Sequence, residues 1–295
     1  MEVTAPSGST WERVRAPWYA TVAFVVISAM ALIVVLGDTE LAHVAGPIGI
    51  LVGDAIAGIM FIRGGRRLKG AERRAWTLVG IGLVVAAMGI VAVSLTVLMV
   101  GDAPTFGFTD LFFGTGYALV LVGFASLPHT AGHPLQRARI AFDGVIGAIS
   151  VGALVWVFVL ERVVHGLDGA PLGDRIFGSI YPLIDLAVVV IIMIVTVRRS
   201  SLRFDLRMFL FTGAVLLQAI ADMSYLVEGA GRSFAEAEPL FLVYLAAAAL
   251  FVATATIVDR LPEPKEYADR RLPLWSILAP YTAAVVMVGV LVARI

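Results

Sequence analysis

The sequence predicts an all-α protein: a polytopic transmembrane helical bundle with about nine membrane spans. Of its 295 residues, 60% are hydrophobic and only 15% are charged, whereas about a quarter of the residues in a soluble domain are charged. The hydrophobic residues occur in runs of about 18–26, each long enough to cross a hydrocarbon core as a helix. Short polar breaks separate these runs, so we expect eight to ten spans in one domain.

Nine segments satisfy this length requirement. They comprise residues 18–36, 42–62, 75–100, 110–127, 140–160, 176–197, 208–227, 239–258 and 272–291. The first is longer than the 7–15 residues of the hydrophobic region in a cleavable signal peptide, so we expect it to be retained. The ninth contains Pro280, and a kinked or half-inserted segment is the alternative to a full crossing there.

The basic residues are distributed unevenly between the two sides of the predicted bundle. The N-terminal segment and the loops 62–74, 128–139, 198–207 and 259–271 hold 18 of the 22 Lys and Arg residues. By the positive-inside rule, we expect a multi-pass protein of the inner (plasma) membrane. Its N-terminal segment 1–17 is predicted to be cytoplasmic, and residues 18–295 to form a single transmembrane domain. The basic loops either contact anionic headgroups of the lipid bilayer or only mark the topology.

Several classes of function are disfavoured by composition. The formal net charge is zero, so no global field favours nucleic acid as a partner. The chain contains no cysteine, which excludes disulfides and thiolate metal sites. His129 and His133 are four residues apart, but Gly132 and Pro134 interrupt any helix that would bring them together. No phosphate-binding loop, nucleophile elbow or zinc-protease motif is present, and we expect neither enzyme activity nor a cofactor or metal.

Two aspartates lie inside predicted spans that are otherwise uncharged. Asp185 belongs to the span 176–197 and Asp222 to the span 208–227. Counted from the basic loop that joins these spans, at a rise of 1.5 Å per residue, their depths differ by only about 3 Å, and Tyr181 and Tyr225 come level in the same way. Because a charge in hydrocarbon costs about 2.5–3.5 kcal/mol, we expect these residues to line a pocket for a small ligand, a cation or a proton. A hydrogen-bond cluster that serves only packing is the alternative.

Five further residues complete the candidate set. Gln218 lies one helical turn before the second of these aspartates. Asp110 begins the fourth span, where it either caps the helix or forms the rim of a pocket with Trp156 at the same depth. Asp54 lies on the glycine-rich face of the second span, and Asp143 lies near the inner end of the fifth. An interfacial salt bridge is the alternative role for this last residue.

Small residues recur at a spacing of four in two predicted spans. The second span carries Gly49, Gly53 and Ala57 on one face, and the fifth carries Gly144, Ala148 and Gly152. This spacing lets helix backbones approach closely in lipid. We interpret it as packing inside one bundle, with a homodimer as the alternative.

Several short motifs together resemble a known family. They are TDLFFGTGY at 109–117, FDGVIGAISVGALVW at 142–156, YPLID at 181–185, ADMSY at 221–225, and Arg271 followed by LAP at 278–280. In order and spacing they resemble the N-terminal membrane input module that precedes GGDEF and EAL cyclic-di-GMP domains in actinobacterial proteins. The similarity covers roughly residues 75–285, although Gly89-Ile90 stands where the module often has a Gly-Asp pair. No GGDEF, EAL or kinase sequence is present, so the resemblance implies a bacterial sensor without cyclase activity of its own.

The expected function is therefore that of a membrane-embedded sensory or regulatory input module. Its site would be a pocket lined by Asp and Tyr in the outer half of the bundle, coupled to a cytoplasmic signalling output outside this chain. A small proton- or cation-coupled transporter that uses the same aspartates is the alternative. Transporters often break a helix near the midplane, whereas Pro47 and Pro182 lie nearer the outer ends of their predicted spans.

Overall fold

The computed structural model describes residues 18–36, 39–100, 107–127, 206–229 and 238–260, with a few single residues between 142 and 188. The helices in this part of the chain are α1 (Trp18–Leu36), α2 (Thr39–Arg67), α3 (Gly70–Val100), α4 (Phe108–Ala125), α8 (Leu206–Gly229) and α9 (Glu238–Arg260). Six helices among the described residues are long and apolar enough to cross a membrane. The all-helical class is confirmed. The count of nine spans stays a prediction, because 272–291 and most of 140–160 and 176–197 lie outside the described residues.

The helices extend beyond the hydrophobic runs that predicted them. The predicted span 42–62 is part of α2, which continues through a basic last turn to Arg67. The chain then turns sharply into α3, with the Leu68 N–H donating to Gly65 O at 3.0 Å. Gly70 at the start of α3 has φ +56°, a left-handed conformation that glycine adopts without the steric cost of a side chain.

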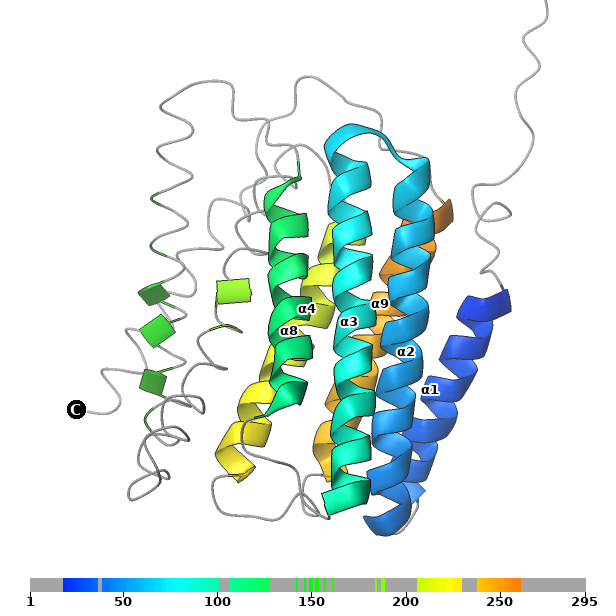
Figure 1. Cartoon of the computed structure of the whole chain (residues 1–295), viewed down its shortest axis with the longest axis vertical. Helices are drawn as coiled ribbons and strands as arrows, with labels where there is room; N and C mark the ends of the chain where they lie inside the picture. The colour runs from blue at the N-terminus through cyan, green and yellow to red at the C-terminus, as the bar shows by residue number, and fades with distance from the viewer. Residues whose placement is uncertain are drawn as a thin grey trace, which may run out of the picture.

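The described helices form two layers with α1 at one edge (Figure 1). Helices α2, α3 and α4 lie side by side in one layer, and α8 and α9 pack behind them. Helix α1 packs against both α2 and α9. We call the end of the bundle that contains the α2–α3 turn the basic end, because Arg63, Arg67, Arg207 and Arg260 lie there.

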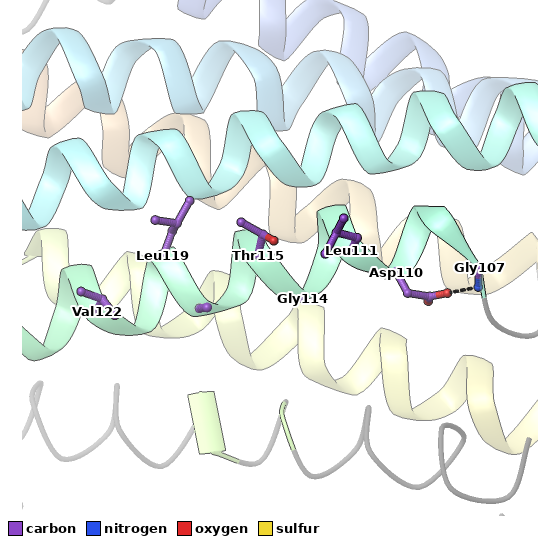
Figure 2. A pocket seen from close by; sticks show the side chains of 8 residues that line it. Gly107, Asp110, Leu111, Gly114, Thr115, Leu119 and Val122 are labelled. Carbon is purple, nitrogen blue, oxygen red and sulfur yellow. Dashed lines mark hydrogen bonds between the residues drawn. The ribbon is translucent and has the colours of Figure 1, made fainter. Parts of the chain in front are cut away.

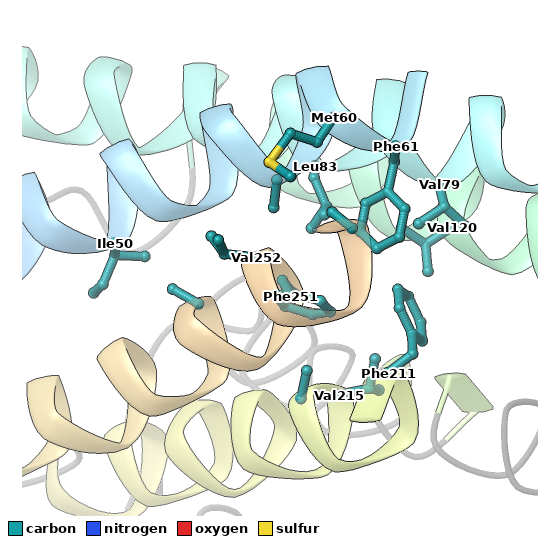
Figure 3. Close-up of a cluster of buried hydrophobic side chains, with 14 of the residues drawn as sticks. Ile50, Met60, Phe61, Val79, Leu83, Val120, Phe211, Val215, Phe251 and Val252 are labelled. Atoms are coloured by element: carbon teal, nitrogen blue, oxygen red, sulfur yellow. The ribbon is translucent and has the colours of Figure 1, made fainter. Parts of the chain in front are cut away.

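Aromatic side chains fill the space between the two layers near the basic end. Phe211 of α8 stacks on Phe124 with ring centroids 4.5 Å apart and contacts Phe251 at 5.3 Å. It also lies 6.0 Å from both Phe61 and Trp76, and these two rings stack at 5.3 Å. Figure 3 shows how Phe61, Phe211 and Phe251 converge from three helices. We call these five side chains the aromatic layer.

Glycines bring the helices of the first layer into backbone contact. A Cβ added at Gly58 would lie 2.8 Å from Gly80 O, and one added at Gly80 would lie 2.5 Å from Gly58 O. The pair Gly82 and Gly116 approaches in the same way, at 2.7 and 2.8 Å. Each pair therefore admits no side chain larger than hydrogen without moving a helix.

The glycine face predicted on the second span packs inside the bundle. Cβ atoms added at Gly49 and Gly53 would collide with Leu245 and Ala248 of α9, respectively. The intramolecular interpretation of this face is confirmed. Gly144 and Ala148 lie outside the part of the chain that the structure describes, and a homodimer stays a prediction.

Candidate functional site

Asp222 is the centre of a hydrogen-bond cluster between the two layers. Tyr117 of α4 donates its hydroxyl proton to Asp222 Oδ2 at 2.5 Å, and Tyr244 of α9 donates to Oδ1 at 2.7 Å. Gln218 Nε2, one turn earlier on α8, lies 3.4 Å and 3.5 Å from the two oxygens. Three helices thus supply neutral donors to one carboxyl group, so the hydrogen bonds of Asp222 connect α4, α8 and α9 at this point.

Asp54 of α2 brings a second carboxyl group to this cluster. Its side chain is buried, with 6% of the residue exposed, and it lies close enough to Asp222 for the two groups to interact electrostatically. Within the described residues, Asp54 Oδ1 has no hydrogen-bond partner. We call Asp54, Tyr117, Gln218, Asp222 and Tyr244 the carboxylate site.

The carboxylate site lies deep in the bundle. Asp222 is in the second half of α8, which begins at the basic end with Leu206, and Tyr244 is in the first half of α9, which ends there with Arg260. At 1.5 Å per residue, both lie about 24 Å from the basic end. Phe211, in the second turn of α8, is only about 8 Å from that end. The aromatic layer therefore lies between the carboxylate site and the basic end.

The structure brings together only part of the predicted site. Asp222 and Gln218 are in contact, as their spacing of four on one helix requires. Asp185 and Tyr181 lie outside the described residues. Their approach to Asp222 stays a prediction. Tyr225 lies half-buried on α8. The fifth-span candidate Asp143 is likewise outside the described residues.

Asp110 lies in the first turn of α4, at the end of the bundle opposite the basic end, and caps this helix. Its Oδ2 accepts a hydrogen bond from the Gly107 N–H at 2.6 Å, and its own N–H donates to Gly107 O at 3.1 Å. Asp110 also lines a cavity of about 540 Å³ along α4, together with mainly apolar side chains such as Leu111 and Leu119 (Figure 2). The capping role is confirmed by these bonds, whereas a pocket rim shared with Trp156 stays a prediction. Trp156, the expected second member of the rim, is 57% exposed.

A second polar cluster lies at the basic end, around Asp259 of α9. Arg67 Nη1 lies 3.1 Å from Asp259 Oδ1 and donates to the backbone carbonyl of Asp259 at 2.9 Å. Arg63 Nε and Arg260 Nε lie at 3.7 Å and 3.9 Å from the carboxylate. Tyr19 of α1 donates to Oδ2 at 3.0 Å, and its ring lies 5.6 Å from the Arg63 guanidinium. We call this group the Asp259 cluster.

A buried ion pair joins the two layers at the same end. Arg207 Nη1 at the start of α8 lies 3.8 Å from Glu72 Oε2 at the start of α3. Their side chains are only 4% and 10% exposed. Breaking such a pair leaves an uncompensated buried charge, so this contact fixes the position of α8 against α3.

Comparison of this chain with known proteins identifies no relative. No protein-family model, no curated protein and no solved structure matches this chain. Among the described residues, no three His, Cys, Asp or Glu side chains are grouped so as to hold a metal ion. The fold defines an all-helical protein whose described residues include six helices long and apolar enough to cross a membrane.

Tyr117, Tyr244 and the Asp259 cluster were not among the predicted site residues. Counting residues from the loop between α8 and α9 would have found Tyr244. This residue lies about as far after the start of α9 as Asp222 lies before the end of α8. Because α8 and α9 are successive antiparallel helices in contact, these two positions come level. Asp259 follows the predicted end of a span, where an acidic residue resembles an ordinary loop residue.

Proposed function

We propose that this chain is a membrane-embedded sensory or regulatory module whose input is proton binding at the carboxylate site. The observation that carries the proposal is the unequal hydrogen bonding of two neighbouring buried carboxyl groups. Asp222 accepts from two tyrosines, whereas Asp54 Oδ1 has no partner among the described residues. Because the two groups interact, the proton that is taken up and released belongs to the pair.

The surroundings of Asp54 contain no described cation that would hold it ionised. Helices α1 and α3, which pack on α2, carry no ionisable side chain at this depth. The ionisable groups that face the site are Asp222, Tyr117 and Tyr244, from α8, α4 and α9. Two ionised carboxylates repel strongly where water is scarce. Protonation of this pair therefore favours a close approach of the Asp54 and Asp222 side chains, and deprotonation opposes it.

Two helices connect this input to the basic end. Helix α2 carries Asp54 and, nearly four turns later, Arg67 of the Asp259 cluster. Helix α9 carries Tyr244 and, about four turns later, Asp259 itself. A change in the packing of α2 and α9 at the carboxylate site is therefore transmitted to residues at the basic end by two continuous helices.

The basic end is the proposed output side. By the charge asymmetry of the sequence, it faces the cytoplasm of a bacterium, where a signalling partner or domain would read the change. The resemblance to input modules of cyclic-di-GMP signalling proteins supports the same assignment. The mechanism is a two-state equilibrium in which the proton binds the closely packed state more tightly.

Spin-label distance measurements test the proposal directly in this cysteine-free chain. Ile59→Cys on α2 and Ile220→Cys on α8 provide labelling positions, because their side chains are 59% and 53% exposed. In lipid nanodiscs, we expect the distance distribution between the labels to shift as the buffer is changed from mildly acidic to mildly alkaline. Asp54→Asn should abolish this shift and hold the acidic distribution at every pH.

Asp110→Asn is the matched control, because it makes the same chemical change at a carboxyl group outside the carboxylate site. It should leave the pH-dependent shift intact. A shift that persists in both Asp54→Asn and Asp222→Asn would refute the proton site. Net proton flux in proteoliposomes, lost in Asp54→Asn, would instead assign the site to a transporter. The aromatic layer argues against a path, because its rings fill the bundle on the basic side.

A further inference from the structure

We propose that Arg63 and Arg67, with Trp18 and Tyr19, form a binding site for the headgroup of an anionic phospholipid at the basic end. This site is separate from the carboxylate site and does not depend on the proposed function. It rests on the charge balance of the Asp259 cluster, the exposure of its arginines and the aromatic residues that lie beside them.

The arginines of the Asp259 cluster are only partly neutralised. Arg63, Arg67 and Arg260 face one carboxylate, which leaves a net charge of +2 for these four side chains. The Asp259 side chain is fully buried, whereas the side chains of Arg63 and Arg67 are 53% and 51% exposed. Each guanidinium therefore contacts the buried anion on one side and presents the rest of its surface outwards.

The geometry of Arg63 suits a phosphodiester group. Its contact with Asp259 uses Nε, at 3.7 Å, and its guanidinium lies over the Tyr19 ring at 5.6 Å. These two contacts hold the planar group, and 53% of the Arg63 side chain remains exposed. Arginine binds phosphate oxygens through two parallel N–H bonds, and a partly positioned guanidinium loses less entropy on binding.

The position of the cluster favours a lipid over a soluble anion. Trp18, which is 76% exposed, packs edge-on against Tyr19 at 5.7 Å at the first turn of a spanning helix. Exposed Trp and Tyr at the end of a spanning helix lie at the level of the lipid headgroups. Arg63 and Arg67 occupy the last turns of α2 beside them, so a phosphate at that level is within reach of both guanidinium groups.

Asp259 competes with the lipid for the same arginines. Its carboxylate occupies the contacts that a phosphate would take on Arg67, at 3.1 Å. Removing this negative charge should strengthen lipid binding, whereas removing a positive charge should weaken it. A general attraction of the basic loops to a negative surface does not predict a difference between equally charged arginines at the same end of the bundle.

Quenching by brominated lipids tests the site in the full chain. A fluorophore attached to Val22→Cys, which is 44% exposed and one turn from Trp18, reports lipids next to α1 in phosphatidylcholine nanodiscs. We expect brominated phosphatidylglycerol to bind there about fivefold more tightly than brominated phosphatidylcholine, the factor that corresponds to one basic residue near the surface. Arg63→Gln should abolish the preference and Asp259→Asn should increase it.

Arg73→Gln is the matched control, because Arg73 is an exposed arginine at the same end on α3. Equal loss of preference in Arg63→Gln and Arg73→Gln would overturn the site in favour of general surface charge. Displacement of the lipid by inorganic phosphate, beyond the effect of chloride at equal ionic strength, would overturn the lipid assignment and point to a soluble anion.

The variants are expected to fold, because Arg67 retains both of its contacts with Asp259 when Arg63 is replaced. Arg63→Lys is a second variant that keeps the charge next to Asp259 but cannot form two parallel bonds to phosphate. It should lower the preference below that of the unsubstituted chain. An undiminished preference in Arg63→Lys would contradict the bidentate geometry proposed for this arginine.

Discussion

Asp222 and Asp259 lie on neighbouring helices, and the protein accommodates them in opposite ways. Both accept hydrogen bonds from tyrosine hydroxyls, at 2.5 and 2.7 Å for Asp222 and at 3.0 Å for Asp259. Asp259 is also surrounded by three arginines. The charged neighbour of Asp222 is instead a second carboxyl group, that of Asp54.

The difference separates an ion-paired carboxylate from a pair of carboxyl groups. A carboxylate held by arginines has compensating positive charge and a fixed geometry, since removing one partner leaves a buried charge uncompensated. A carboxylate held by neutral donors beside a second carboxyl group depends on how many protons the pair contains. The same residue type thus ties helices together at the basic end and, in the proposed function, provides the responsive element in the centre.

The largest expected effect comes from the aromatic layer that separates the two regions. Phe211→Ala removes a fully buried ring that contacts four other aromatic side chains, and should lower the free energy of unfolding by about 3–5 kcal/mol. Phe209→Ala, two residues away and 60% exposed, is the control and should cost much less. Unfolding in a mixed-micelle titration measures both, and equal costs would contradict the central position of Phe211.

The second largest effect is expected when an arginine of the Asp259 cluster at the basic end is replaced. Arg67→Gln removes an ion pair and a bond to the Asp259 carbonyl, and should cost about 2 kcal/mol, between the values for exposed and buried pairs. Arg66→Gln changes the neighbouring exposed arginine and should cost less than about 0.5 kcal/mol. The same unfolding titration compares them. Similar values would mean that the Asp259 cluster contributes no more than surface charge.

The smallest effects are expected when one tyrosine hydroxyl is removed, either from the carboxylate site or from the Asp259 cluster. Tyr244→Phe removes a donor to Asp222 and leaves Tyr117 and Gln218 as its neutral donors, and should cost about 1–1.5 kcal/mol. Tyr19→Phe removes a donor to Asp259, which keeps its arginines, and should cost about 0.5 kcal/mol. Thermal unfolding measures the difference, and the reverse order would break the contrast between the two aspartates.

Much of the fold could be predicted from hydrophobic run length alone. The predicted first span, residues 18–36, coincides with α1, because the hydrocarbon core requires about 20 consecutive apolar residues. The prediction ended α2 too early, before its basic last turn, and began α3 too late, after its polar first turn. Backbone hydrogen bonds continue into polar flanking residues, which hydropathy does not register.

The site could be predicted only where its residues are unusual in a membrane. Asp54, Asp222 and Gln218 stand out because charged and amide side chains are costly in hydrocarbon. Tyr117 and Tyr244 do not stand out, since tyrosine is compatible with apolar spans. Their roles depend on which helices are neighbours, and this information lies in tertiary packing and not in the period of any one helix.

The glycine contacts between helices have a mechanical consequence. Backbone contact at Gly58–Gly80, at Gly82–Gly116 and at Gly64–Asp259 opposes sliding of α2, α3, α4 and α9 against one another. Helix α8 meets α9 through ordinary side-chain contact, as at Gly213 and Leu250. Tyr117 and Tyr244 therefore belong to the glycine-packed helices, whereas Asp222 belongs to α8. A small displacement of α8 would stretch or break both tyrosine hydrogen bonds to Asp222.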